Sequence, residues 1–407
     1  MDNATRRVAI TGMGVIGALG HDAGTTWSAM REGRSAIGPI VNMPTDLLVI
    51  RIAAEIRGYD PLQHFDSKRL ILLDRVSQLA LVAAREAVAQ AGLEFRASGL
   101  GERTACIIGT GIGGENSHNE QSSRFYGDRN PRVHPLAIVR VMANAPACHV
   151  GMEFGLTGPS FAVVSACASA NHAMGQAFEM VRSGKVDLAV TGGSEACITV
   201  PTVKAWEAMR VTADDTCRPF CKQRRGMVLG EGAGIFVLEE YEHARRRGAT
   251  ILAEFAGFGM SADAGDIVLP SEAGAAKALS AALADARLAP EDVDYINAHG
   301  TGTPANDPTE SKAIRRVFGA HADKLAVSST KSMHGHALGA AGAIELVAAI
   351  GALRDGVVPP TANFIDPDPE CDLDYVPNTA REMPVAAVLS NSFAFGGLNA
   401  VVALRRA

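Results

Sequence analysis

FAVVSACASANHAMGQAFEMV (residues 161–181) is the stretch that decides the fold of this 407-residue chain. The apolar run at 161–164 is typical of a buried β-strand, and the small residues after it predict a turn. Apolar side chains then recur at the three- and four-residue spacing of an amphipathic helix, at Ala170, Ala173, Met174, Ala177, Phe178 and Val181. Cys167 is therefore predicted to lie at the N-terminus of a helix that follows a strand directly.

The same order of strand, turn and helix returns in LAVSSTKSMHGHALGAAGAIELV (325–347). Three further pairs of segments recur in order: 6–17 with 251–262, 188–196 with 387–397, and 232–240 with 398–406. Strand-like and helical runs alternate along the chain, which is typical of an α/β fold. Four echoes in one order indicate an internal duplication with halves 1–250 and 251–407. Turns from both halves can then meet at one site.

Composition narrows the function classes. The chain is 47% hydrophobic with 42 glycines, its net charge is −6 and its pI is near 6. A nucleic-acid binder would show a basic stripe, so we expect no nucleic-acid partner. No continuous apolar stretch reaches membrane-spanning length, so we expect no membrane partner and a cytoplasmic location. Seven scattered cysteines do not form a disulfide framework, and Cys217 and Cys221 are expected to be free thiols rather than metal ligands.

Cys167 is a candidate nucleophile because unpaired N–H groups and the helix dipole favour a thiolate at a helix N-terminus. This position predicts a lowered thiol pKa. Taken alone, the cysteine is better explained as a small buried hydrophobe, as most cysteines are. Cys106 also lies in a predicted strand but opens no helix, and we interpret it as structural.

The second half supplies polar partners. His299 stands where an apolar strand gives way to a Gly/Thr/Pro loop, and Lys331 and His336 lie in the echo of the cysteine turn. The repeat therefore predicts that His336 faces Cys167 across an internal pseudo-dyad. Gly396 and Gly397 mark a place for left-handed backbone angles.

Four motifs together resemble the elongating β-ketoacyl-acyl carrier protein synthases (type II) of the thiolase-like superfamily. They are SACASA (165–170), NAHGTGTPANDPTE (297–310), STKSMHGHALGAAGA (329–343) and NSFAFGG (391–397), and the similarity runs nearly end to end. The resemblance implies a thiolase-like fold, a duplicated five-layer αβαβα sandwich, and a homodimer.

The resemblance implies a decarboxylative condensation of an acyl-Cys167 thioester with malonyl-acyl carrier protein, giving a 3-oxoacyl product in fatty-acid elongation. The implied catalytic residues are Cys167, His299, His336 and Lys331. The backbone N–H groups of Cys167 and Phe395 would form the oxyanion hole, and Phe395 would be the gate. Glu345 would support the histidines, and the remaining implied substrate contacts are Thr301, Thr303, Ile112 and Trp206.

Two positions depart from the family pattern. Ala394 stands where the family has a glycine that lets the phenylalanine loop swing, and alanine disfavours left-handed angles. The indole of Trp206 stands where a smaller or phenyl side chain is expected near the acyl channel, and core packing explains it equally well. Two pathways are therefore almost equally well supported. One is housekeeping elongation, and the other is a specialised acyl or polyketide pathway such as that of the nodulation enzyme.

Partners and ions also follow from the resemblance. An acidic acyl carrier protein would dock on Lys68, Arg132 and Arg210, carrying the phosphopantetheine, so the chain itself needs no cofactor. No catalytic metal is implied. A monovalent cation would lie near four oxygen-bearing residues, Asn297, Glu345, Ser390 and Asn391.

Other activities remain open on the residues alone. A thiolase would carry a second cysteine near the C-terminus, and none follows Cys371. An initiating synthase would carry Asn in place of one histidine. A non-catalytic carrier-binding partner would not need Cys167 and both histidines, and a cysteine hydrolase would leave the second histidine unexplained.

Overall fold

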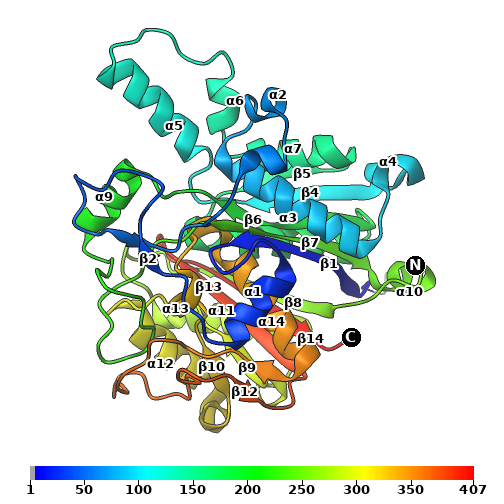
Figure 1. Cartoon of the computed structure of the whole chain (residues 1–407). Coiled ribbons are helices and arrows are strands. Elements are labelled where there is room, and N and C mark those ends of the chain that lie inside the picture. The colour runs from blue at the N-terminus through cyan, green and yellow to red at the C-terminus, as the bar shows by residue number, and fades with distance from the viewer. Residues whose placement is uncertain (1–4) are drawn as a thin grey trace.

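The computed structural model describes residues 5–407, and its core is a ten-stranded mixed sheet (Figure 1). One half of the sheet has the order β5 (Ser160–Val163), β4 (Thr104–Gly109), β6 (Leu188–Glu195), β7 (Gly232–Glu240) and β1 (Val8–Gly17). The other half has the order β10 (Ala326–Ser328), β9 (Tyr295–Asn297), β13 (Ala387–Ala394), β14 (Leu398–Arg405) and β8 (Ala253–Ala262).

The two halves repeat one topology. In each, the first three strands are parallel and the last two run antiparallel to their neighbours. The segments that echo each other in the sequence occupy equivalent places in the two halves. β1 and β8 join the halves through three residue pairs, from Val8 with Phe255 to Ile10 with Ala253. The exact division at residue 250 stays a prediction.

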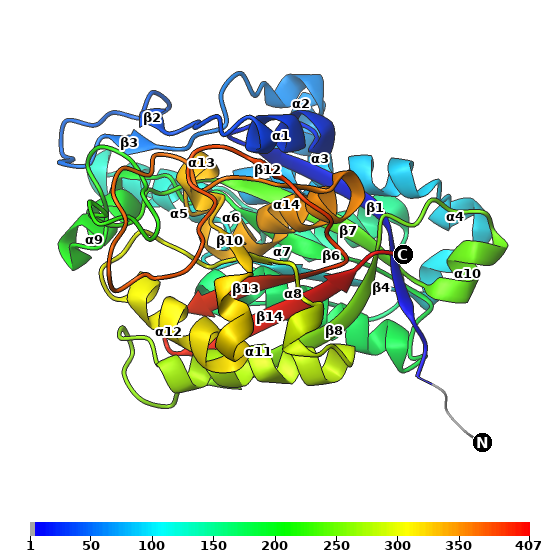
Figure 2. The same cartoon turned by 90° about the horizontal axis from the view of Figure 1, so that it is seen from below.

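Helices form the other layers of the fold (Figure 2). α8 (Ser169–Arg182) and α14 (Ala341–Asp355) lie between the two half-sheets and contact both. α3 (Arg75–Ala91) and α7 (Ala145–Phe154) cover the first half, whereas α11 (Glu272–Ala286) and α12 (Asn306–Phe318) cover the second. α14 is buried from Ala341 to Leu353, as expected of a helix that is apolar on all sides. The arrangement is the expected five-layer αβαβα sandwich.

The remaining elements are short or peripheral. The other helices are α1 (Ala23–Arg31), α2 (Ser67–Leu70), α4 (Phe95–Ser98), α5 (Glu115–Ser122), α6 (Ala137–Val141), α9 (Val200–Met209), α10 (Tyr241–Arg246) and α13 (Lys331–His334). Two small ribbons pair β2 (Gly38–Pro39) with β3 (Ile52–Ala53), and β11 (Val357–Val358) with β12 (Arg381–Glu382). Across residues 5–407, no helix combines the length and the apolar character needed to cross a bilayer.

The opening stretch folds as predicted in its helix and differently in its strand. All six apolar positions of the predicted ladder are buried in α8. β5 is an edge strand of the sheet, however, and Val164 just after it is 57% exposed. The prediction of a buried strand at 161–164 was therefore wrong, because an apolar run does not reveal whether both edges of a strand are covered.

Candidate active site

Cys167 lies in a single 3₁₀ turn, Ala166–Ala168, between β5 and the first residue of α8. The residue before it, Ala166, has a left-handed backbone with φ of 49°. This conformation is unfavourable for a residue with a side chain and is typical of functional turns. The turn buries the thiol and directs it toward the second half of the chain.

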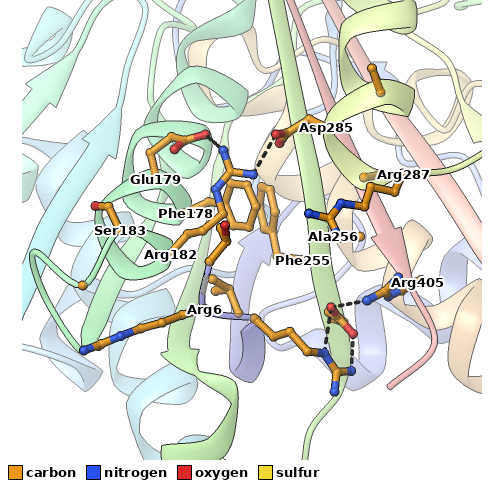
Figure 3. Close-up of a pocket in the computed structure, with 17 residues that line it drawn as sticks. Arg6, Phe178, Glu179, Arg182, Ser183, Phe255, Ala256, Asp285, Arg287 and Arg405 are labelled. Atoms are coloured by element: carbon orange, nitrogen blue, oxygen red, sulfur yellow. Dashed lines mark hydrogen bonds and ion pairs between the residues drawn. The ribbon is translucent and has the colours of Figure 1, made fainter. Parts of the chain in front are cut away.

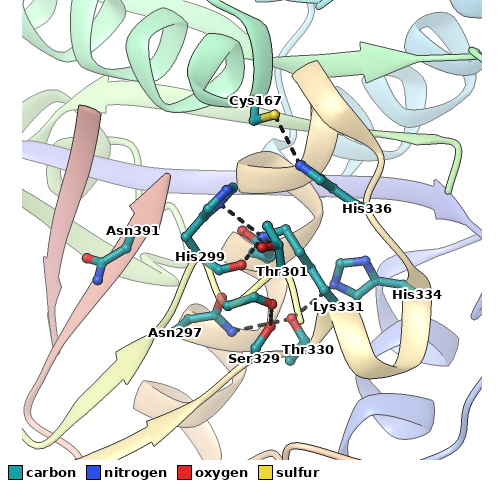
Figure 4. Close-up of polar contacts among 12 residues, drawn as sticks. Cys167, Asn297, His299, Thr301, Ser329, Thr330, Lys331, His334, His336 and Asn391 are labelled. Carbon is teal, nitrogen blue, oxygen red and sulfur yellow. Dashed lines mark hydrogen bonds and ion pairs between the residues drawn. The ribbon is translucent and has the colours of Figure 1, made fainter. Parts of the chain in front are cut away.

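His336 contacts the thiol directly. Its Nε2 atom lies 3.1 Å from the Cys167 Sγ atom (Figure 4). The His336 backbone is held by the first half of the chain, because its N–H donates to the Val228 carbonyl and its carbonyl accepts from the Gly230 N–H. The predicted meeting of His336 and Cys167 across the pseudo-dyad is confirmed.

His299 completes the cluster, with its ring centroid 5.4 Å from that of His336. The His299 N–H donates to Glu310 Oε1 at 2.8 Å, and Lys331 Nζ donates to the His299 carbonyl at 2.7 Å. Lys331 Nζ also lies 3.4 Å from His299 Nδ1 and pairs with Glu345, and both members of the pair are fully buried. The lysine proton facing Nδ1 favours the tautomer of His299 that carries its proton on Nε2.

Burial sets the protonation of this site. Burial raises the pKa of the Cys167 thiol to about 12, although the nearby charge of Lys331 acts against this shift. The expected lowering of the Cys167 pKa by the helix N-terminus was wrong, because the thiol is desolvated. Burial and the charge of Lys331 hold the pKa of both His299 and His336 well below the ordinary value. The resting pair is therefore a neutral thiol beside a neutral imidazole, and Cys167 needs His336 as a base.

The three side chains open into one cavity of about 170 Å³. Its walls include Trp206 from α9 and Phe395 from the turn after β13, and Thr301 and Thr303 lie on the loop after β9. The hydroxyl oxygens of these two threonines are 2.9 Å apart. The apolar part of the lining is completed by Val211, Met227, Val268, Pro270, Pro304, Ala305, Phe393 and Ala394.

The turn that carries Phe395 has the backbone expected of its glycines. Gly396 and Gly397 have φ of 80° and 68°, in the left-handed region. A Cβ atom on Gly397 would lie 2.4 Å from the Cβ atom of Asp263. Ala394 ends β13 without a left-handed angle, so alanine fits this conformation of the turn.

The structure leaves one predicted substrate contact outside the cavity. Ile112 is 40% exposed and does not line the cavity with Cys167. The three predicted docking residues Lys68, Arg132 and Arg210 are exposed, and none of them forms an ion pair with another residue of the described range 5–407. Arg210 directly follows α9, the helix that carries Trp206.

The predicted cation residues share an unusual property. Asn297, Glu345, Ser390 and Asn391 are fully buried, and one side-chain oxygen of each has no hydrogen-bond donor among the described residues. Asn297 and Ser390 are paired in register on β9 and β13. Asn391 follows Ser390 and so faces the other side of the strand, where its amide donates to Glu310. Orphaned buried oxygens fit a hard monovalent cation better than they fit an apolar core.

Three buried carboxylates were missed by the sequence analysis. Glu310 accepts the N–H groups of His299 and Gly300, and Asp307 accepts those of Phe220 and Gly302. Glu195 accepts the N–H groups of Gly111, Ile112 and Gly339, and burial raises its pKa to about 7. Asp307 and Glu310 lie within a quoted motif, and their place in a Gly/Thr-rich loop was the available signal.

A larger groove of about 870 Å³ shares no residue with this cavity (Figure 3). Four of its five arginines are already paired with carboxylates: Arg6 with Asp187, Arg7 and Arg405 with Glu254, and Arg182 with Glu179 and Asp285. Arg287 has no ion pair within the described residues 5–407. α8 and α11 also end at this groove, and the C-terminal ends of helices repel anions. Most of its arginine charge is thus balanced by carboxylates and helix ends, which argues against an anion site.

The chain is similar to known proteins along nearly its whole length. Residues 5–244 match the family "Beta-ketoacyl synthase, N-terminal domain", and residues 252–365 match "Beta-ketoacyl synthase, C-terminal domain". Nodulation protein E of Rhizobium sp. (strain N33) is 52% identical over 401 residues, covering 98% of this chain and 99% of that protein. The 3-oxoacyl-[acyl-carrier-protein] synthase 2 of Coxiella burnetii is 42% identical over 409 residues, with the same coverage.

A solved structure shows the same architecture. A type II polyketide ketosynthase, solved in complex with its acyl-carrier protein, superposes with a TM-score of 0.90 at 31% identity. The match covers 99% of this chain and 100% of that one. Its thiolase-like fold is the fold described above. With a buried cysteine and two histidines in one cavity and matches along nearly its whole length, the chain belongs to the β-ketoacyl synthase family, whose acyltransferases form 3-oxoacyl thioesters by condensation.

Proposed function

We propose that Cys167 takes an acyl group from an acyl carrier protein and passes it to a malonyl unit. The observation that carries this proposal is the 3.1 Å contact between Cys167 Sγ and His336 Nε2, inside a cavity that His299 also lines. His336 accepts the thiol proton as the sulfur attacks the acyl thioester carbonyl, and that proton leaves on the released carrier thiol. The product of this half-reaction is an acyl-Cys167 thioester.

The second half-reaction uses both histidines. After the carrier thiol has left, the neutral His336 ring moves its proton from Nδ1 to Nε2 by exchange with water, and the Nε2–H groups of His299 and His336 stabilise the enolate oxygen that forms when the malonyl thioester loses CO₂. The enolate carbon attacks the acyl-Cys167 carbonyl, the carbon–sulfur bond breaks, and the thiolate takes up one proton from solvent, which is the proton that the overall condensation consumes. Lys331 supports this step from behind His299, because it holds the backbone carbonyl and faces Nδ1. Glu345 neutralises the buried lysine.

Backbone N–H groups of Cys167 and Phe395 are the oxyanion donors in this proposal. Among the described residues 5–407, neither N–H donates to a backbone carbonyl of another turn, loop or strand, which supports their availability to a substrate oxygen. A single such donor contributes about 3 kcal/mol of transition-state stabilisation in other enzymes. Thr301 and Thr303 lie on the cavity wall where hydroxyls can bind the amides of a pantetheine arm.

We assign the chain to a specialised acyl pathway rather than to housekeeping elongation. The support is similarity: 52% identity to nodulation protein E against 42% to synthase 2, each over nearly the full length. Trp206 and Ala394 differ from the sequence pattern that we expect of an elongating synthase. The same chemistry in housekeeping elongation is the second candidate, and the chain-length profile of the product distinguishes the two.

The proposed partners are an acyl carrier protein and a second copy of the chain. The carrier would approach Lys68, Arg132 and Arg210 and deliver phosphopantetheine, so the chain needs no cofactor of its own. A second copy would cover β5, whose outer edge is the end of the sheet beside the exposed Met152 and Val164. Seven free cysteines support a reducing compartment such as the cytoplasm.

We further propose a monovalent cation beside the active site. The oxygens of Asn297, Glu345 and Ser390 would hold it, whereas Asn391 lies on the other face of β13 and would not contact it. Such an ion would satisfy buried oxygens that have no hydrogen-bond donor among the described residues and fix the loops around His299. It takes no part in bond making.

The test is intact-mass analysis of products from the enzyme, malonyl-carrier protein and acyl-carrier proteins of several chain lengths. We expect a 3-oxoacyl product two carbons longer than the acyl donor, with a narrow chain preference, and none from Cys167→Ala. Equal turnover of all saturated chains would assign the chain to housekeeping elongation. Free acid as the only product would overturn condensation in favour of hydrolysis, and an absent acyl-enzyme would favour a non-catalytic carrier-binding partner.

A further inference from the structure

Two aromatic rings lie against each other in the cavity that leads to Cys167. The Trp206 indole and the Phe395 ring are stacked, with centroids 5.8 Å apart and planes inclined by 25°. Both line the same 170 Å³ cavity as Cys167 and His336. The two rings come from different halves of the chain and from elements of different rigidity.

Trp206 is the rigidly held ring of the stacked pair. It lies in the middle of α9, a ten-residue helix whose first turn is capped by the side chain of Thr199. Glu207, the next residue of α9, accepts the backbone N–H groups of Val49 and Ile50 and pairs with Lys204. The indole is therefore fixed in place by the helix and its neighbours.

Phe395 is the ring of the stacked pair that can move. It stands at the tip of the β13–β14 hairpin and is followed by two left-handed glycines, whose backbone can adopt many angles. Apart from the rings, the tip is held by hydrogen bonds from the Gly396 N–H to the Ile267 carbonyl, from the Gly397 N–H to the Ala394 carbonyl, and from the Asp263 N–H and the Asn399 amide to the Gly397 carbonyl. None of these bonds is made by Phe395 itself, so contact with the indole is a large part of what keeps the Phe395 ring in this position.

We propose that Trp206 is a latch that holds Phe395 in the closed position and so admits slender, unbranched thioesters to Cys167 in preference to bulky ones. A cavity of 170 Å³ leaves little room beside a linear chain, and a wider group enters only when the stack opens. The substrate class rests on the proposed function, but the latch itself does not. Because the stack must open first, a bulky group is expected to react with Cys167 about three- to tenfold more slowly, a factor that follows from the usual strength of aromatic pairs.

Alkylation of Cys167 tests the latch without any condensation. Two reagents are compared by intact mass, iodoacetamide and a bulky N-aryl iodoacetamide, with Cys167→Ala as the blank. Trp206→Ala is expected to speed the bulky reagent three- to tenfold and to leave iodoacetamide within twofold. Trp206→Phe keeps a stacking ring and is expected to behave as the wild type. Met209→Ala is the matched control, because Met209 lies on the same helix, is 42% exposed and does not line the cavity.

Tryptophan emission supplies a second measurement. The chain has two tryptophans, and Trp27 is buried and bonded to Asp355 away from the cavity. The difference between wild type and Trp206→Phe therefore isolates the Trp206 emission, which is expected to shift when the bulky reagent occupies Cys167 and not when iodoacetamide does.

Several results overturn the latch. They are equal bulky-reagent rates in wild type and Trp206→Ala, equal acceleration of both reagents, a Trp206→Phe variant as fast as Trp206→Ala, or an unchanged Trp206 emission. Failure of the proposed function would give a different result. If no 3-oxoacyl product forms but alkylation still depends on the size of the reagent, the substrate assignment is wrong and the latch is retained.

Discussion

Replacing Lys331 by methionine removes one member of a fully buried ion pair. Lys331 and Glu345 have side chains with no exposed surface, and Lys331 also donates to the His299 carbonyl at 2.7 Å. Without the lysine, the buried Glu345 carboxylate loses the side chain with which it forms its ion pair. Breaking a buried pair in this way costs about 3–5 kcal/mol of stability. We therefore expect Lys331→Met to lower the free energy of unfolding by about that amount.

The double variant separates the effect of the unpaired buried charge on stability from the effect of lost packing. Lys331→Met with Glu345→Met replaces both charges by apolar side chains, so no uncompensated carboxylate remains. Because apolar replacement of a whole buried pair is often neutral or stabilising, the double variant is expected to regain at least about 2 kcal/mol over Lys331→Met. Condensation stays slow in both variants, since neither restores the hold on His299.

Urea unfolding at fixed protein and salt concentration measures these differences. Lys324→Met is the matched control, since Lys324 is an exposed lysine just before β10 and its loss is expected to change stability by less than about 0.5 kcal/mol. The reasoning fails if Lys331→Met unfolds within about 1 kcal/mol of the wild type. It also fails if the double variant is no more stable than the single one.

Three further predictions concern the proton path and the buried carboxylates. His336→Ala is expected to slow acylation of Cys167 by about 10²–10⁴-fold, measured as acyl-enzyme mass against time, and a loss under tenfold would contradict the role of base. Glu310→Gln is expected to slow condensation at least about tenfold while acylation keeps its rate, because Glu310 holds the His299 backbone; equal slowing of both steps would contradict a role specific to His299. Burial raises the Glu195 pKa from 4.5 to about 7, so the folded chain binds this proton more tightly and its stability falls as pH rises through that range. The free energy of unfolding is measured with urea between pH 4.5 and 8. Glu195→Gln is expected to remove up to about 3 kcal/mol of its decrease over this range. The same pH dependence in wild type and variant would refute the role of Glu195.

Periodicity and repetition predicted most of the architecture. The helix after Cys167 follows from six apolar positions, and all six are buried. The contact between Cys167 and His336 followed from a different argument, because equivalent turns of a duplicated fold must lie across its pseudo-dyad. Both predictions rest on local patterns that the chain carries twice.

Depth of burial could not be predicted from the same patterns. β5 has an apolar sequence whether its outer edge is covered or open, so its exposure was not predictable. The Cys167 pKa depends on a balance between the helix N-terminus and desolvation, and only the structure shows that the thiol is buried. Glu195 and Glu310 resemble surface charges in sequence, because a buried carboxylate is recognised by the N–H groups that it accepts.

The two halves explain why one turn carries a nucleophile and the other does not. The 3₁₀ turns Ala166–Ala168 and Leu338–Ala340 each precede a central helix, and each begins with a left-handed residue, with φ of 49° at Ala166 and 40° at Leu338. The second residue of the turn is Cys167 in one half and Gly339 in the other.

A side chain at the glycine position has no room. A Cβ atom on Gly339 would lie 2.1 Å from the Gly111 backbone nitrogen, so a second cysteine could not occupy this turn without moving the chain. The second half instead places His336 three residues earlier, beside the thiol of the first half. One strained turn therefore presents the sulfur, while its glycine counterpart packs tightly against Thr110 and Gly111 of the first half and leaves a histidine of the second half to act on the thiol.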